Sequence, residues 1–302
     1  SYLAELLLEK GYEVYGLLRR ASSDNLTRLA HIEDALRLLA GDLTDSGSLE
    51  RAVQLARPHE VYNFAAQSYV GTSFIEPLHT SDVTGLGALR LFEAVRLMTA
   101  VSDGPRLYQA SSSEMFGHAP VPQDETTPLA PVSPYGCAKA FAHYCAHVYR
   151  HAYQMYITCG IGFNHESPRR GGEFVTRKIT KAVGAIKRGT QQELVLGNLQ
   201  ARRDWCHAKD IARAAWLSLR PPRPDDYVFA SGVSHTVQEF VDRAFTLAGL
   251  KAADYVRQSP QLWRPQDIAD LCGNAMKAQT VLAWTPTVTF DELVAEMVAA
   301  DA

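Results

Sequence analysis

The stretch RLYQASSSE, residues 106–114, passes from a predicted strand into polar residues, and this change is the main indication of the fold class. Its first five residues, Arg106–Ala110, have the short apolar pattern of a buried β-strand, and polar residues follow immediately. Ser112 and Glu114 therefore stand just after the end of a predicted strand, at the edge where open α/β sheets bind their ligands. We expect both side chains to belong to a functional site.

Outward from this strand, short apolar segments alternate with helical patterns along the chain. Strands are predicted at residues 13–18, 36–40, 60–65, 106–110, 155–163, 193–196 and 227–231, and helices at about 1–10, 25–34, 46–57, 76–98, 134–153, 173–188, 206–219, 236–248 and 289–300. Strands that alternate with helices are typical of a parallel sheet covered on both faces. The sequence therefore predicts an α/β fold with a doubly wound parallel sheet.

Tyr135 and Lys139 stand at positions i and i+4 of a segment whose helical start is well marked. Ser133 suits the N-cap and Pro134 the first helical position, so both residues fall on one face of the first turns. An ammonium beside a phenol favours the phenolate, and we expect the pKa of Tyr135 to fall toward the range of a general base. The spacing alone is a common coincidence, and its interpretation depends on the surrounding motifs.

The composition is that of an ordinary globular protein and argues against several classes. The chain has 302 residues, of which 46% are hydrophobic and 21% charged, and its net charge is −3 at pH 7. It has no basic block and no apolar run of membrane-spanning length, so we expect neither nucleic acid nor a membrane as a partner. The five cysteines are scattered without ligand spacing, which indicates reduced thiols in a cytoplasmic protein and no bound metal.

Seven distinctive stretches run in order over almost the whole chain. They are GDLTD (41–45), NFAAQS (63–68), QASSSEMFG (109–117), SPYGCAK (133–139), FNHESPRR (163–170), FVTRK (174–178), and RDW followed by HAKD (203–210). Together they resemble the extended short-chain dehydrogenase/reductase family, and within it the GDP-mannose 4,6-dehydratases. The resemblance implies an NAD(P)-binding Rossmann domain formed by residues 1–164 and about 205–231. A smaller α/β domain that binds the GDP-sugar would comprise about 165–204 and 232–302.

The resemblance implies a lyase that converts GDP-mannose to GDP-4-keto-6-deoxymannose. The reaction would combine transient oxidation at C4, loss of water across C5–C6 and return of the hydride to C6. Tyr135, supported by Lys139, would take the proton of the C4 hydroxyl, and Ser112 would hydrogen-bond the same oxygen. Glu114 would remove the proton from C5. The Ser113-Glu114 pair resembles that of dehydratases acting on GDP-mannose, whereas dehydratases of dTDP-glucose carry Asp-Glu there.

The cofactor implied is NADP. Arg19 and Arg20 follow the strand predicted at 13–18, where an NAD-selecting acid would otherwise stand, and two cations suit a 2′-phosphate. By resemblance, the further cofactor contacts would be Asp42, Leu43, Ala65, Gln67, Lys139, His165 and Arg170. The GDP-sugar would be bound by Asn164, Glu166, Arg177, Lys178, Arg203 and Arg264.

The chain also departs from the family pattern. The Gly-rich loop that would follow a first strand is missing, and Gly85-Leu86-Gly87 lies inside a helical pattern that does not replace it. We therefore expect the chain to be a trimmed part of a longer protein. Ser112 stands where the family usually has Thr, His79 where it has Tyr, and Val132 where it has Arg.

Two alternative functions fit the same residues. One is a nucleotide-sugar epimerase or reductase of the same fold, for which Glu114 would be dispensable. The other is a non-catalytic homologue that does not bind the cofactor, which the missing loop suggests. The resemblance further implies a homo-oligomer, a dimer or tetramer with residues 19–28 near a neighbour's cofactor, and a place in GDP-fucose biosynthesis.

Overall fold

The computed structural model describes residues 1–20, 26–99 and 104–302. The chain forms two compact units, of which the first contains residues 1–115, 133–161 and 212–227 and the second contains residues 116–132, 162–211 and 228–302. Within the described ranges, no helix has both the length and the apolar character needed to span a bilayer. Each unit is considered separately below.

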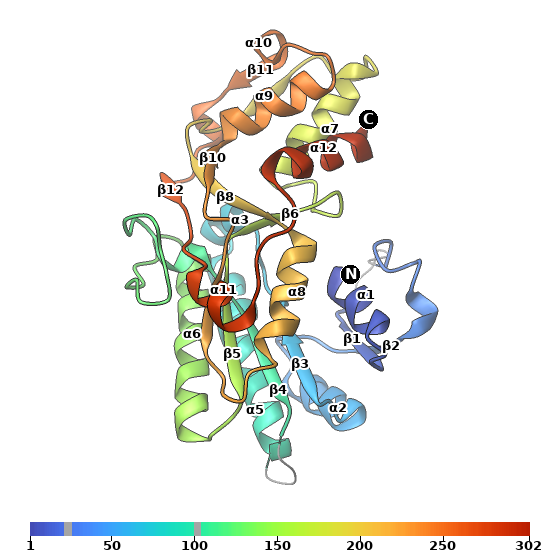
Figure 1. The fold of residues 1–302 in the computed structure, drawn as a ribbon, viewed down its shortest axis with the longest axis vertical. Helices are drawn as coiled ribbons and strands as arrows, with labels where there is room; N and C mark the ends of the chain where they lie inside the picture. The colour runs from blue at the N-terminus through green and yellow to red at the C-terminus, as the bar shows by residue number, and fades with distance from the viewer. Residues whose placement is uncertain (21–25, 100–103) are drawn as a thin grey trace. The chain divides into compact units, whose positions relative to one another are not determined.

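The first unit is organised around parallel strands, as the alternating pattern predicts (Figure 1). One sheet has the strand order β3-β4-β5-β9, from β3 (Glu60–Asn63), β4 (Arg106–Ser112), β5 (Ile157–Gly162) and β9 (Asp226–Phe229). A separate parallel pair joins β1 (Val14–Leu18) to β2 (Leu36–Ala40). The accompanying helices are α1 (Tyr2–Glu9), α2 (Ser46–Ala56), α3 (Val70–Ile75), α5 (Gly87–Thr99), α6 (Pro134–Ala152) and α8 (Ala208–Ser218).

Apolar side chains from the helices and strands form the core of this unit. Leu49 of α2, Phe92 and Val95 of α5, Leu107 of β4 and Ile157 of β5 belong to one buried cluster. Burying a side chain of this size stabilises the fold by roughly 1.5–3 kcal/mol relative to leaving it in water. This core fixes the positions of the strand ends that carry the candidate site residues.

The helix predicted at 76–98 is a continuous helical segment with an irregular middle. It consists of α4 (Pro77–Ser81), a π-helical turn η2 (Asp82–Leu86) and α5. A Cβ atom added at Gly87 would lie only 2.7 Å from the Cβ of Leu43. Close packing therefore explains a glycine inside this helix, in agreement with its position in a helical pattern.

The helix predicted at 25–34 is wrong for the residues that the structure describes, and residue 25 lies outside them. Residues 26–32 form successive turns, in which Leu29 N–H donates to Leu26 and Ile32 N–H donates to Leu29. A short 3₁₀ turn, η1 (Glu33–Ala35), follows before β2. None of residues 26–34 is buried, and a short helix without a buried face gains too little to offset its ordering entropy.

The second unit has two small sheets. In one, β8 (Arg202–His207) pairs with β6 (Asn164–Glu166), β10 (Ser234–Thr236) and β12 (Asp270–Leu271). In the other, β7 (Leu194–Leu196) runs parallel to β11 (Val256–Gln258). The helices are α7 (Val175–Lys187), α9 (Val237–Leu247), α10 (Ala252–Tyr255), α11 (Met276–Leu282) and α12 (Phe290–Asp301).

The core of the second unit is formed by α7, α9 and α12 together with β8. Phe240 and Phe245 of α9, Met297 of α12 and Trp205 of β8 are all buried in one cluster. Both α9 and α12 begin with a reciprocal capping box, in which a threonine and a glutamate satisfy backbone N–H groups. The predicted helix at 206–219 begins later, at Ala208, because the preceding residues pair as β8.

Candidate active site

The four residues predicted to be catalytic lie on neighbouring elements of the first unit. Ser112 is the last residue of β4, and Glu114 lies in the 3₁₀ turn η3 (Ser113–Met115) that follows directly. Tyr135 and Lys139 lie in the first two turns of α6, which contacts both β4 and η3. The fold therefore brings together the strand end and the helix start that the sequence singled out.

Local hydrogen bonds set the start of α6 and the turn after β4. Ser133 caps α6 by accepting a hydrogen bond from Gly136 N–H at 3.0 Å, as the Ser-Pro pair predicts. Ser112 Oγ accepts a hydrogen bond from Glu114 N–H at 3.2 Å. All four predicted catalytic side chains are buried, so they belong to a site with restricted access to water.

Lys139 is the group of this site with the clearest electrostatic perturbation. Its Nζ donates a hydrogen bond to the carbonyl of Ala110 at 2.7 Å and lies 5.8 Å from the ring centre of Tyr135. Burial lowers the pKa of Lys139 to about 8, because the charged form loses hydration. An amine with such a pKa can change its charge near neutral pH, which is typical of residues that take part in proton transfer.

Two predicted cofactor contacts follow the ends of adjacent strands. Leu18 and Ala40 are register partners in the parallel β1–β2 pair, so Arg19 and Asp42 lie just beyond the same sheet edge. The backbone N–H of Thr44, and to a smaller extent Arg19, hold the pKa of Asp42 below its usual value. The Arg19 side chain is exposed, as is that of Arg20, whereas Leu43 is buried against the core.

The loop after β3 is held by amide side chains, of which Asn63 and Gln109 are not among the predicted site residues and Gln67 is a predicted cofactor contact. Asn63 Nδ2 donates to Gln109 Oε1 at 2.8 Å, and Asn63 Oδ1 accepts from Ala65 N–H at 3.2 Å. Gln67 Nε2 donates to Thr80 Oγ1 at 3.1 Å. The sequence does contain a signal for this pair: Asn63 and Gln109 stand near the ends of two predicted strands, and such side chains can meet across a parallel sheet.

In the second unit, Glu166 is the most buried of the predicted site residues on β6. Its carboxylate accepts a hydrogen bond from Thr176 Oγ1 at 2.6 Å and forms an ion pair with Arg170 Nε at 3.3 Å. Burial raises the pKa of Glu166, although Arg170 and Thr176 act in the opposite direction. Asn164 and His165 lie on the same strand, and His165 Nδ1 is 2.9 Å from a backbone carbonyl.

The basic candidates on α7 make contacts inside the second unit. Arg177 forms an ion pair with Asp301 of α12 at 2.8 Å, and both side chains are largely buried. Lys178 Nζ donates to the carbonyl of Val195 at 2.8 Å. These neighbouring residues therefore point to different partners.

Arg203 and Arg264 lie on different segments of the second unit. Arg203, on β8, donates to the carbonyl of Ile268 at 2.7 Å and forms an ion pair with Asp267 at 3.2 Å. Arg264 is half-buried and follows the 3₁₀ turn η4 (Pro260–Leu262). The contacts of Arg203 bring it to the segment that immediately follows Arg264.

The parallel sheet and the buried Tyr–Lys pair beside its strand ends define a Rossmann-fold protein of the short-chain dehydrogenase/reductase class. A similar solved structure is "UDP-glucose 4-epimerase complex with NAD" from Thermus thermophilus. It is 26% identical to this chain, covers 99% of this chain and 94% of its own, and has a TM-score of 0.87. This similarity confirms the predicted fold class.

The sequence comparisons are more specific. A family model described as GDP-mannose 4,6 dehydratase matches residues 1–297. GDP-mannose 4,6 dehydratase 1 of Arabidopsis thaliana is 51% identical over 311 residues, with 100% of this chain and 86% of the relative covered. The human GDP-mannose 4,6 dehydratase is 45% identical over 327 residues, with 100% and 88% covered. The chain belongs to the GDP-mannose 4,6-dehydratase family, as the seven motifs predict.

Proposed function

We propose that this protein is an NADP-dependent hydro-lyase that converts GDP-mannose to GDP-4-keto-6-deoxymannose. The observation that carries the proposal is the position of Glu114, directly after the β4 strand end and next to the helix that holds Tyr135 and Lys139. Family membership supports the same reaction, since both relatives compared above are named for it.

The first proton transfer in this proposal belongs to Tyr135. The phenolate form takes the proton from the C4 hydroxyl, and Lys139 favours that form when its amine is protonated. Ser112 holds the C4 oxygen by a hydrogen bond. A bound nicotinamide supplies the hydride acceptor for C4 and the hydride donor for C6.

Glu114 distinguishes the dehydratase from the alternative reactions. A keto group at C4 makes the C5 proton acidic, and a carboxylate at this position can take it and pass a proton to the hydroxyl group that leaves C6 as water. An epimerase or reductase of the same fold needs the hydroxyl, the phenol and the amine but no base for C5. The buried carboxyl at the strand end therefore favours the dehydratase.

We assign the NADP site mainly to the strand ends of the first unit. Residues that follow β1 and β2 lie beyond the carboxyl ends of one parallel pair, and residues that follow β3 and β4 lie beyond those of another. Dinucleotides bind at such strand ends in this fold. The donor set fits NADP because Arg19 and Arg20 are exposed cations that suit a 2′-phosphate. The remaining proposed contacts are Asp42, Leu43, Ala65, Gln67, Lys139, His165 and Arg170.

We assign the GDP-sugar to residues about 165–204 and 232–302, and the cofactor to residues 1–164 and about 205–231. The polar and cationic groups near β6, β8 and α7 support this assignment, because cations and hydrogen-bond donors suit a diphosphate. The proposed contacts are Asn164, Glu166, Arg177, Lys178, Arg203 and Arg264.

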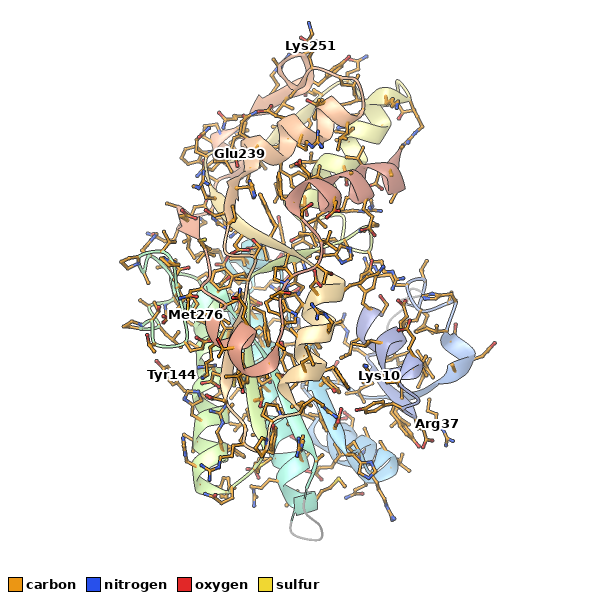
Figure 2. The ribbon with its side chains drawn as sticks, viewed as in Figure 1. Lys10, Arg37, Tyr144, Glu239, Lys251 and Met276 are labelled. Atoms are coloured by element: carbon orange, nitrogen blue, oxygen red, sulfur yellow. The ribbon has the colours of Figure 1, made fainter. Side chains whose placement is uncertain are left out.

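We also propose that the protein is a cytoplasmic homo-oligomer, a dimer or tetramer, that acts in GDP-fucose biosynthesis. All five cysteines are free thiols, which fits a reducing compartment. Phe141, Tyr144 and Val148 on α6 are exposed apolar or aromatic side chains, and Tyr144 is labelled in Figure 2. Such a stripe suits a subunit contact, and a monomeric sedimentation profile would argue against it.

The test is incubation with GDP-mannose and NADP in deuterated water, followed by mass spectrometry. We expect a product that has lost one water and gained deuterium at C5. Glu114→Gln should abolish both, whereas Glu193→Gln, a change on an exposed residue, should leave them unchanged. Deuterium-free conversion to an epimer, or full dehydration by Glu114→Gln, would contradict the proposal.

A further inference from the structure

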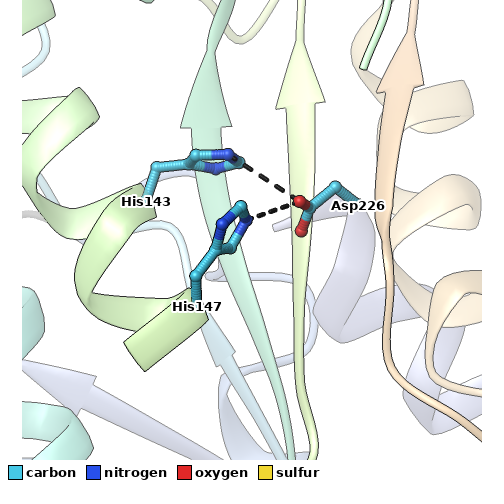
Figure 3. A group of neighbouring side chains, drawn as sticks. All are labelled: His143, His147 and Asp226. Atoms are coloured by element: carbon cyan, nitrogen blue, oxygen red, sulfur yellow. Dashed lines mark hydrogen bonds and ion pairs between the residues drawn. The ribbon is translucent and has the colours of Figure 1, made fainter. Parts of the chain in front are cut away.

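A second cluster of titratable side chains lies along the middle of α6, beyond Lys139. His143 and His147 are one turn apart on this helix, and Asp226 of β9 faces both (Figure 3). Asp226 Oδ2 is 2.6 Å from His147 Nε2 and 3.8 Å from His143 Nε2. The ligand atoms that the three residues offer all lie within 4.8 Å of one another.

Neighbouring groups orient two of these side chains toward the cluster. His143 Nδ1 is 2.9 Å from Ser111 Oγ, so its other nitrogen, Nε2, is the one that faces Asp226. Arg150 donates to Asp226 Oδ1 at 2.6 Å, which leaves Oδ2 toward the two imidazoles. Metal-binding histidines and carboxylates are commonly held in this way by a hydrogen bond on their second polar atom.

We propose that His143, His147 and Asp226 form a binding site for Zn²⁺ or a similar divalent transition metal. Two histidines at i and i+4 on one helix face are a common chelating pair for zinc. Tetrahedral zinc with bonds of about 2.0–2.1 Å places its ligand atoms roughly 3.3 Å apart. The 3.8 Å separation of His143 Nε2 from Asp226 Oδ2 is close to that spacing, whereas the 2.6 Å hydrogen bond between His147 and Asp226 must open to admit the ion.

The surroundings determine what such an ion does. His147 is 34% exposed, so a water molecule can complete the coordination and the ion has a route in from solvent. Arg150 is a positive charge close to the site, which reduces the affinity relative to an uncharged neighbourhood. The ion would connect α6 to β9 one turn beyond Lys139 and fix this helix, and its binding does not depend on the reaction proposed above.

The experiment uses the purified protein after treatment with EDTA and removal of the chelator. Calorimetric titration with Zn²⁺ should show one ion per chain, and Co²⁺ should give the visible absorption of a four-coordinate site. His147→Gln keeps a hydrogen-bond donor for Asp226 but removes the imidazole. It should weaken Zn²⁺ binding by about 100-fold or more.

The matched control is His151→Gln, on the same helix one turn further and exposed. It should bind Zn²⁺ like the unchanged protein, and circular dichroism of both variants verifies that they are folded. Zn²⁺ binding that is absent from the unchanged protein, or equally strong in both variants, would overturn the proposal. The three residues would then form only an ion-paired network.

Discussion

Two buried basic side chains, one from each unit, are held in different ways. In the first unit, Lys139 is buried against a backbone carbonyl, and its pKa is lowered to about 8. In the second unit, Arg177 is buried against Asp301, and Arg170 pairs with Glu166. A buried cation without a counter-charge loses hydration, so its pKa is lowered, and such groups cluster at functional sites. A cation paired with a buried carboxylate instead leaves an uncompensated charge if either partner is removed.

The strongest test of this comparison is to remove one lysine from each unit. Lys139→Met should lower the turnover of GDP-mannose by about 10²–10⁴-fold, because the positive charge beside Tyr135 is lost. Lys178→Met should raise the KM for GDP-mannose and change turnover only slightly, because Lys178 is proposed to bind substrate. Steady-state kinetics of both variants measure turnover and KM, and equal losses of turnover would contradict the different roles assigned to the two lysines.

The reverse test concerns stability. Arg177→Met leaves the Asp301 carboxylate buried without its ion-pair partner, and should lower the free energy of unfolding by about 3 kcal/mol. Urea denaturation measures this loss, and Asp301→Asn in the same chain should restore part of it. A raised KM for GDP-mannose is also expected, since Arg177 is a proposed substrate contact, but an unchanged free energy of unfolding would contradict a stabilising role for this ion pair.

The lowered pKa of Lys139 also predicts how stability depends on pH. Between pH 8 and 10.5 the unfolded chain holds a proton on Lys139 that the folded chain has released, so stability rises with pH through this window. From pH 7 to pH 9.5 the lysine should contribute a gain of about 2 kcal/mol. Urea denaturation of Lys139→Met should show a pH profile without this gain, and identical profiles would mean that Lys139 is hydrated.

The smallest expected effect concerns a hydrated cation of the first unit. Arg19→Ser should raise the KM for NADP by about 10-fold and leave the KM for NAD unchanged, because a charge-assisted hydrogen bond to the 2′-phosphate is lost. Initial rates with each dinucleotide measure the ratio. Arg257→Ser, an exposed arginine of the second unit, is the control, and the same shift in both would contradict the assignment.

Much of the fold could be predicted because its elements have strong local signals. The strand predicted at 36–40 is β2, and the helix predicted from Ser133 and Pro134 is α6. The short strands β8, β10 and β12 were missed, because their pairing depends on partners far away in the sequence. The helix predicted at 25–34 is wrong for a different reason: its local pattern is periodic, but none of its described residues packs against a core.

The site was predictable only in part. Motifs single out Ser112, Glu114, Tyr135 and Lys139, and the fold places them on adjacent elements. The amide pair of Asn63 and Gln109 depends on strand order, which the motifs do not contain. The cluster around Asp226 was missed because its members come from distant segments, although His143 and His147 stand at a recognisable spacing.

The four-residue spacing along α6 has a mechanical consequence. Tyr135, Lys139, His143 and His147 follow at steps of four, and each step turns by about 40° around the helix axis. These four side chains therefore point in successively rotated directions. Lys139 contacts β4, and His147, about 12 Å further along the axis, contacts β9. Because a helix of this length is stiff, twisting the His147 end also rotates the phenol of Tyr135. The orientation of the Tyr135 phenol, the proposed catalytic base, is thus coupled to the contact between His147 and Asp226 on the same helix.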